Sequence, residues 1–209
     1  MSLSEQDVLV VVDVQNDFVS GSMAIAGSKS IIAPINAIAS AIPNVVVATD
    51  WHPMGHVSFA SSHRGTKHGD TVDVFYGQQR VYHDHCVQGE WGAELDPDLR
   101  LGKAQLILRK GYRMGVESNG SFYENDGVTR TGLGDYLRAR GISRVYCAGL
   151  ARYGCVMQTA LGAARDGFEV FMIDDASAGR PRDDEAEILR DLQARGIAWV
   201  HSRDLLYGR

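Results

Sequence analysis

The sequence lacks the features that mark membrane, secreted and nucleic-acid-binding proteins. None of its apolar runs approaches the roughly 18 residues that a membrane-spanning helix requires. The first residues, MSLSEQDVLVVVD, contain no basic region followed by a long apolar stretch and a cleavage site, so we expect a cytoplasmic protein without a signal peptide. The net charge of −5 argues against a nucleic-acid partner.

Cysteine is also scarce, since only Cys86, Cys147 and Cys155 occur in the chain. An odd number of thiols in a reducing compartment argues against a disulfide framework, so each thiol is either a small buried side chain or a reactive group. Cys147 lies in the middle of an apolar run, which favours burial. Cys155 lies where an apolar run gives way to a helical pattern, and this position suggests a reactive thiol.

What remains is the composition of an ordinary globular protein. The chain has 209 residues, of which 44% are apolar and 22% are charged, enough to build a large core. It contains no internal repeat, low-complexity tract or linker-like segment. We therefore expect a single domain over residues 1–209.

Apolar runs alternate with amphipathic helical patterns along the chain. The runs are typical of strands buried on both faces, at residues 8–13, 45–49, 106–108, 145–150, 168–173 and 197–200. Helices are expected between most of them, at residues 30–42, 131–141, 156–167 and 183–196. This order predicts an α/β fold of three layers, in which a mostly parallel six-stranded sheet carries helices on both faces.

Residues 50–104 interrupt this alternation and contain all but one of the histidines. A connection this long inside a compact domain usually has a function. Asp50 and His52 form an Asp-x-His pair, which together with a distant histidine suits Zn²⁺ or Fe²⁺ with open coordination positions. His83 and His85 compete for the third position. Alternate residues of an extended segment face opposite ways, so only one of them should bind the metal.

Polar side chains directly follow four of the predicted strands. They are Asp13, Asp50, Lys110 and the turn that contains Cys155. In open α/β sheets ligands bind beyond the carboxyl ends of the strands, so these groups are expected in one cleft. A helix N-terminus and a nearby ammonium group would stabilise a Cys155 thiolate, and Asp13 could exchange protons with it. Considered alone, Cys155 could instead be a small buried side chain. Asp13 and Lys110 considered without it could form a structural ion pair.

Six longer motifs occur in order over nearly the whole chain. They are DVQNDF (13–18), GSMAIAG (21–27), TDWHPMGHVSFASSH (49–63), HCVQGEWGAEL (85–95), KGYRMGVESNGSF (110–122) and GLARYGCVMQTALGA (149–163). Together they resemble the nicotinamidase/pyrazinamidase branch of the isochorismatase-like cysteine hydrolase family. The resemblance implies an isochorismatase-like fold, with a metal-loop insertion at about residues 50–104.

By motif position, the resemblance implies a catalytic set. Cys155 is the nucleophile, Asp13 the proton shuttle, and Lys110 the group that orients and electrostatically supports both. A cis peptide is implied between Leu150 and Ala151, which lets the N–H groups of Ala151 and Cys155 point at one oxyanion.

The resemblance also implies one divalent transition metal, with zinc as the first choice and iron or manganese as alternatives. Asp50, His52 and His85 align with the metal ligands, and His85 is preferred to His83 because it directly precedes CVQG. The metal would hold the pyridine nitrogen of the substrate. His56 matches a position that some relatives use near the metal, and we leave it outside this set.

In the substrate region, Phe18 matches an aromatic residue that packs on the substrate ring in the branch. Two other segments of this region depart from the branch. Relatives usually have Thr-Asp and an aromatic residue before the cysteine, where this chain has Arg152-Tyr153-Gly154. They also tend to have Trp-Pro where this chain has Tyr82-His83, although Tyr82 can stack on a ring as well. We expect Arg152 to point away from the cleft, because a side chain beside an oxyanion turn must leave space for the acyl group.

The resemblance implies that the protein deaminates nicotinamide to nicotinate and ammonia through a thioester, within NAD salvage and pyridine nucleotide metabolism. The alternative is a related cysteine hydrolase that acts on another small amide, an acidic one among the options, and the two departures motivate it. A non-catalytic binding module and an isochorismatase-type vinyl-ether hydrolase are disfavoured, because the catalytic residues and the metal segments are all present. The expected partner is a small-molecule amide, without nucleic acid or membrane, and a homo-oligomer is left open.

Overall fold

Six strands form the central sheet of the protein, whose structure is a computed structural model that describes residues 3–208. Their order across the sheet is β5-β2-β1-β6-β7-β8, and every neighbouring pair is parallel. The strands are β1 (Asp7–Val12), β2 (Asn44–Asp50), β5 (Leu106–Lys110), β6 (Arg144–Leu150), β7 (Glu169–Ala178) and β8 (Ile197–Val200). All six predicted strands are confirmed, and this sheet is parallel throughout.

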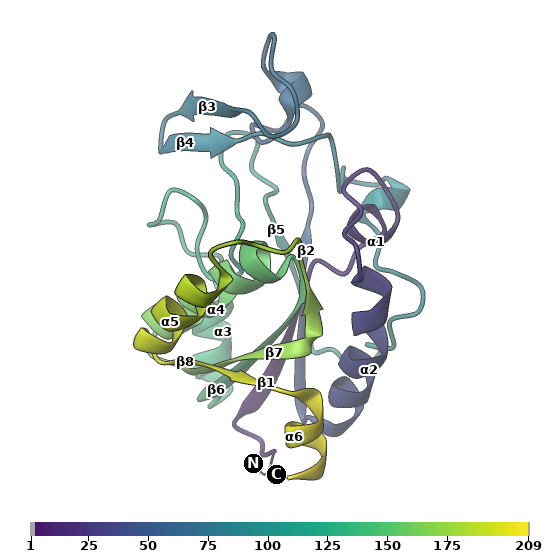
Figure 1. Cartoon of the computed structure of the whole chain (residues 1–209), viewed down its shortest axis with the longest axis vertical. Helices are drawn as coiled ribbons and strands as arrows, with labels where there is room; N and C mark the ends of the chain where they lie inside the picture. The colour runs from purple at the N-terminus through teal and green to yellow at the C-terminus, as the bar shows by residue number, and fades with distance from the viewer. Residues whose placement is uncertain (1–2, 209) are drawn as a thin grey trace.

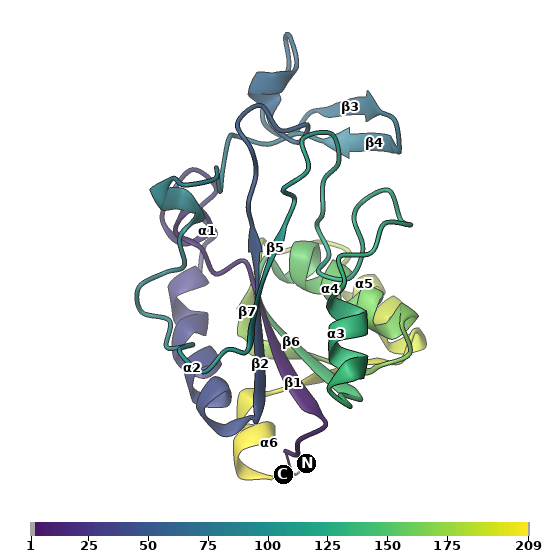
Figure 2. The same cartoon turned by 180° about the vertical axis from the view of Figure 1, so that it is seen from behind.

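Helices cover both faces of the sheet (Figure 1, Figure 2). One face carries α2 (Ile32–Ala41) and α6 (Ser202–Tyr207), and the other carries α3 (Leu133–Ala139), α4 (Met157–Arg165) and α5 (Glu185–Ala194). The three-layer prediction is therefore confirmed. The short helices α1 (Asn16–Val19) and α6 were not predicted, because four and six residues carry too little periodicity to reveal a helix. Within residues 3–208, no helix is both long and apolar enough to cross a membrane.

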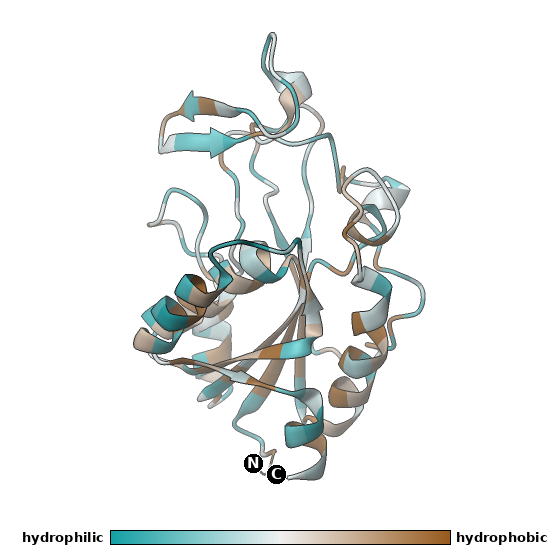
Figure 3. Cartoon of the chain, viewed as in Figure 1, coloured by the Kyte–Doolittle hydropathy of each residue, from teal (hydrophilic) through white to brown (hydrophobic). Residues whose placement is uncertain are grey.

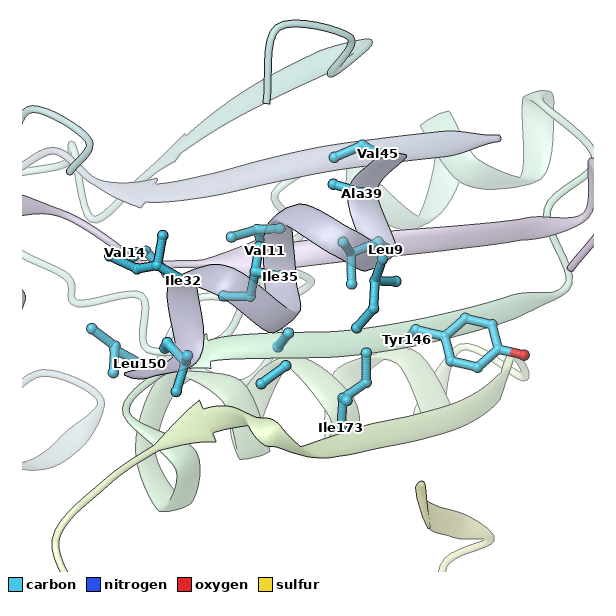
Figure 4. Packing of buried hydrophobic residues seen from close by; sticks show 14 of the residues in the cluster. Leu9, Val11, Val14, Ile32, Ile35, Ala39, Val45, Tyr146, Leu150 and Ile173 are labelled. Carbon is cyan, nitrogen blue, oxygen red and sulfur yellow. The ribbon is translucent and has the colours of Figure 1, made fainter. Parts of the chain in front are cut away.

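Strand β1 contributes to both halves of the core, because its successive side chains point to opposite faces of the sheet. Leu9 and Val11 lie in one buried cluster with Ile35 of α2, as Figure 4 shows, whereas Val8 and Val10 lie in the cluster on the opposite face. Apolar residues are concentrated on the strands and on the helix faces that meet them (Figure 3). A strand buried on both faces must be apolar at every position, and this is why the run was recognisable in the sequence.

Most of the chain between β2 and β5 lies beyond the carboxyl ends of the strands, and its last residues return beside α2 (Figure 1, Figure 2). It contains the antiparallel hairpin of β3 (Thr71–Val74) and β4 (Gly77–Arg80), with short 3-10 turns at Ala60–Ser62 and Trp91–Ala93. The hairpin was not predicted, because TVDV and GQQR offer little apolar alternation. This segment covers the edge of the sheet where parallel α/β folds bind ligands.

Candidate active site

The carboxyl ends of β1, β2, β5 and β6 bring four polar side chains together. Lys110 ends β5, and its ammonium nitrogen lies 2.8 Å from Asp13 Oδ2 and 2.5 Å from Asp50 Oδ1. The same nitrogen donates a 3.1 Å hydrogen bond to the carbonyl of Ser118. The Cys155 sulfur and one carboxylate oxygen from each of Asp13 and Asp50 lie within 4.8 Å of one another. An acid, a base and a thiol are therefore within reach of a single bound molecule.

The backbone between β6 and α4 has an unusual course that places the thiol. Gly149 has a φ of 124°, and a Cβ at this position would lie 2.0 Å from the Val12 carbonyl oxygen, so only glycine fits between the two strands. The next peptide, Leu150–Ala151, is cis, as the family resemblance implied. A turn over Arg152–Val156 follows, and it delivers Cys155 just before α4 begins.

The charges around the thiol favour its protonated form. Burial raises the pKa of Cys155 well above its usual value; Lys110 opposes this, but Asp13 and Asp50 add to it. Burial and the charge of Asp50 also raise the pKa of Asp13 to about 7, although Lys110 lowers it. The thiolate expected from the sequence is therefore wrong for this structure. It has instead a neutral thiol beside a carboxyl group that exchanges protons near neutral pH.

Asp50, His52 and His85 form a buried group suited to a metal ion. Asp50 Oδ2 lies 3.6 Å from His52 Nε2 and 3.9 Å from His85 Nε2. Each Nδ1 lies close to a backbone carbonyl, at 2.9 Å from Gly111 for His52 and 2.7 Å from His83 for His85. Each Nδ1 therefore carries the ring proton, which leaves the lone pair of Nε2 available to a metal ion. His52 Nε2 has no hydrogen-bond partner among residues 3–208. Two imidazoles and a carboxylate fit zinc, iron or manganese.

Glu117 is a member of this region that the sequence analysis missed. Its side chain is 4% exposed, and Oε2 lies 3.8 Å from His52 Nε2 and 4.0 Å from His56 Nδ1. Burial alone would lower the pKa of His52, but Glu117 and Asp50 raise it to about 9. The two carboxylates thus attract a positive charge to this point, which a proton or a metal ion can supply. The sequence signal was weak, because Glu117 is a lone acid in a loop that follows no strand directly.

The histidines left outside the predicted ligand set are placed differently. In His56, Nδ1 accepts a hydrogen bond from Ser58 Oγ at 2.8 Å and Nε2 donates one to the Val116 carbonyl at 3.2 Å. Its ring stacks on His52, with 4.3 Å between centroids, and so supports that residue. His83 is exposed, and its ring stacks on His68.

A cavity of about 280 Å³ is lined by Cys155 together with the predicted metal ligands Asp50 and His85. Phe18 and Tyr82 line its walls, with ring centroids 5.5 and 6.0 Å from that of His85. The cavity is also lined by residues not foreseen from the sequence, namely Met23, Ile25, His68, Arg80, Glu117, Asn119, Gly179, Arg180 and Arg182. Because Phe18, Tyr82 and Cys155 line the same cavity, a flat ring bound there can contact aromatic side chains and reach the thiol.

Leu150 and Ala151, which the cis peptide joins and which we expected to contact the substrate, are placed differently from each other. Ala151 lines the cavity, but the side chain of Leu150 is fully buried in the core beside α2, as Figure 4 shows. Leu150 therefore contributes its backbone and does not touch the cavity with its side chain. A larger open depression, of about 700 Å³, is lined by residues that include Tyr123 and Arg165, and none of the predicted site residues lines it.

Arg152 points away from the cavity, in the orientation expected from the sequence. Its Nη2 donates hydrogen bonds to the carbonyls of Asp174 at 2.7 Å and Ser177 at 2.8 Å, and its Nη1 lies 3.2 Å from Asp174 Oδ1. The guanidinium also lies over the Trp199 ring. Arg152 thus joins the Arg152–Val156 turn to β7 and β8.

Comparisons with known proteins agree with this geometry. The isochorismatase domain family matches residues 7–204. A nicotinamidase from Acinetobacter baylyi is 40% identical over 208 residues, which cover 99% of this chain and 97% of the relative. A nicotinamidase/pyrazinamidase structure from Acinetobacter baumanii has a TM-score of 0.92 and 41% identity, covering 96% of this chain and 98% of that chain. A pyrazinamidase from Pyrococcus horikoshii in complex with zinc has a TM-score of 0.76 and 31% identity, covering 94% and 99%. This chain therefore belongs to the isochorismatase family.

Proposed function

We propose that this protein, acting as one domain, is a metal-containing cysteine amidohydrolase that converts nicotinamide to nicotinate and ammonia. One observation carries the proposal: the Cys155 thiol lines a cavity beside the buried Asp13–Lys110 pair, and Asp50, one of the predicted metal ligands, lines the same cavity within 4.8 Å of that thiol. The named activities of the similar proteins support it. Such an activity would serve NAD salvage in the cytoplasm.

The first half of the reaction forms a thioester on Cys155. Asp13 accepts the thiol proton, the sulfur bonds to the amide carbon, and the carbonyl oxygen becomes an oxyanion. The N–H groups of Ala151 and Cys155 donate hydrogen bonds to that oxygen. Lys110 stays protonated, because Asp13 and Asp50 raise its pKa well above the usual value despite its burial, so it supports the developing negative charge. Asp13 then gives its proton to the amide nitrogen, the C–N bond breaks, and ammonia leaves.

The second half hydrolyses the thioester. Asp13 takes a proton from water, the resulting hydroxide bonds to the acyl carbon, and the C–S bond breaks. The proton on Asp13 returns to the sulfur, and the released nicotinic acid ionises to nicotinate. A carboxyl group with a pKa of about 7 can accept and return protons at neutral pH, which both halves require.

The remaining residues hold the ring. Phe18 and Tyr82 flank it and provide the aromatic walls that a flat, neutral substrate needs. Asp50, His52 and His85 would hold one divalent metal ion, zinc first with iron or manganese as alternatives. When bound, this ion supplies a Lewis acid for the pyridine nitrogen.

The test is ammonia release by the purified protein from nicotinamide and from a panel of other aromatic and aliphatic amides. Cys155→Ala should abolish turnover and keep the fold, whereas Cys147→Ala, the matched control inside β6, should lose stability at most. Mass spectrometry of acid-quenched wild type should find the acyl group on Cys155. Substantial turnover by Cys155→Ala would refute the covalent mechanism. Hydrolysis of another amide with none of nicotinamide would favour the rival amidase.

A further inference from the structure

The outer end of the cavity carries two arginines that the proposed mechanism does not use. Arg80 ends β4 and Arg180 follows β7, and both line the cavity and are exposed to solvent. Within residues 3–208, neither guanidinium has an ion-pair or hydrogen-bond partner. Arg182, at the same mouth, differs because its Nε and Nη2 bind the carboxylate of Asp184 at 2.7 and 2.6 Å.

The carboxylates that line the cavity lie at its inner end and are already engaged. Asp50 binds Lys110, and Glu117 lies against His52, and both acids are buried. No carboxylate of the described residues therefore neutralises Arg80 or Arg180, and the mouth keeps two positive charges.

His68 lines the same cavity as these two arginines. Its centroid is 5.8 Å from that of Tyr82, so it adjoins the wall of the cavity. Burial lowers the pKa of His68, and the charges of His83, Arg180 and Arg80 lower it further. The charges of both arginines thus act on the His68 ring, and all three side chains line one cavity, although they come from elements far apart in the sequence.

We infer that this mouth, formed by His68, Arg80 and Arg180, binds an anionic group that the ligand carries on the side of its ring away from the amide. The inference rests on the proposed function, because it takes the Cys155 end of the cavity as the amide end. A guanidinium matches a carboxylate or phosphate with paired, charge-assisted hydrogen bonds. Neutral nicotinamide makes no use of these charges. Ring-carboxylated aromatic amides are therefore a substrate class of this site.

The experiment measures kcat/KM for nicotinamide and for nicotinamides that carry a carboxylate at each ring position in turn. The variants are Arg80→Gln/Arg180→Gln and the control Arg190→Gln, which removes charge from an exposed part of α5 outside the cavity. The ratio of kcat/KM for the anionic amide to kcat/KM for nicotinamide should fall about tenfold in the double variant. This is the lower end of the effect expected for hydrogen bonds to charged groups, because both arginines are exposed. It should be unchanged in the control. Added salt should lower the ratio in wild type more than in the double variant.

Three results would overturn the inference: an unchanged ratio in the double variant, an equal fall in the control, or no hydrolysis of any carboxylated amide while nicotinamide is turned over. Inhibition by nicotinate shows whether the mouth binds free carboxylates in place of carboxylated substrates. If the double variant weakens that inhibition but leaves the ratio unchanged, the mouth holds free carboxylates and the substrate class is wrong. If wild type hydrolyses no amide, the proposed function fails. Calorimetry then measures the binding of a pyridine dicarboxylate to wild type and to the double variant. About tenfold weaker binding by the double variant would support anion binding at the mouth, and equal binding would overturn it.

Discussion

Replacing Lys110 with methionine removes the ammonium group that lies between two buried carboxylates. Lys110 is 1% exposed, and its nitrogen lies 2.8 Å from Asp13 and 2.5 Å from Asp50. At an effective dielectric constant of about 20, each contact represents roughly 6 kcal/mol of Coulomb attraction before desolvation is subtracted. Because removing one partner of a buried ion pair costs about 3–5 kcal/mol net, we expect Lys110→Met to lower the free energy of unfolding by that amount.

The loss of stability should grow with pH, because the pKa of Asp13 is raised from 3.8 to about 7 in the folded protein. The folded state then binds a proton more tightly than the unfolded state, so the stability that this group contributes at low pH is lost as pH rises from 3.8 to 7. Without Lys110 the pKa of Asp13 rises further, and the decline continues above pH 7 at about 1.4 kcal/mol per pH unit. The difference from wild type should be about 2 kcal/mol larger at pH 8.5 than at pH 7.

The assay is urea unfolding of the metal-free protein at several pH values, followed by tryptophan fluorescence. Lys67→Met is the matched control, because Lys67 is exposed, and it should change stability by less than about 0.5 kcal/mol. Asp13→Asn combined with Lys110→Met should abolish the growth above pH 7. A loss below about 1 kcal/mol at pH 8.5, or a loss independent of pH, would show that these charges are not buried together as the structure has them.

The remaining predictions concern the metal and the first departure from the family pattern. We expect elemental analysis to find a metal in the purified wild-type protein and none in His85→Ala. His83→Ala should retain the metal, since His83 is exposed. The reverse result would make His83 the ligand. Arg152→Ala should cost about 1–2 kcal/mol in urea unfolding, because two carbonyls lose their donor. It should leave the preference between nicotinamide and an acidic amide unchanged, and a tenfold fall confined to the acidic amide would place Arg152 in the site.

Residues that directly follow a buried strand were predictable, and residues in the long connections were not. Asp13, Asp50 and Lys110 each come after an apolar run, and parallel strands end at one edge of the sheet. The histidines were harder. Alternation predicted that only one of His83 and His85 would bind, and the family resemblance chose His85, which the structure buries while it exposes His83.

The sequence by itself determined the order of strands and helices and the clustering of chemistry at one sheet edge. The physical reason is that burial on both faces demands apolar residues throughout a strand, and this pattern is local. Only the tertiary structure placed Glu117 beside the histidines and brought Arg80 and Arg180 to one cavity, because these residues come from segments that share no periodic pattern. It also decided the charge of Cys155. A helix terminus is visible in the sequence, but the burial and the two carboxylates that keep the thiol protonated exist only once the chain has folded.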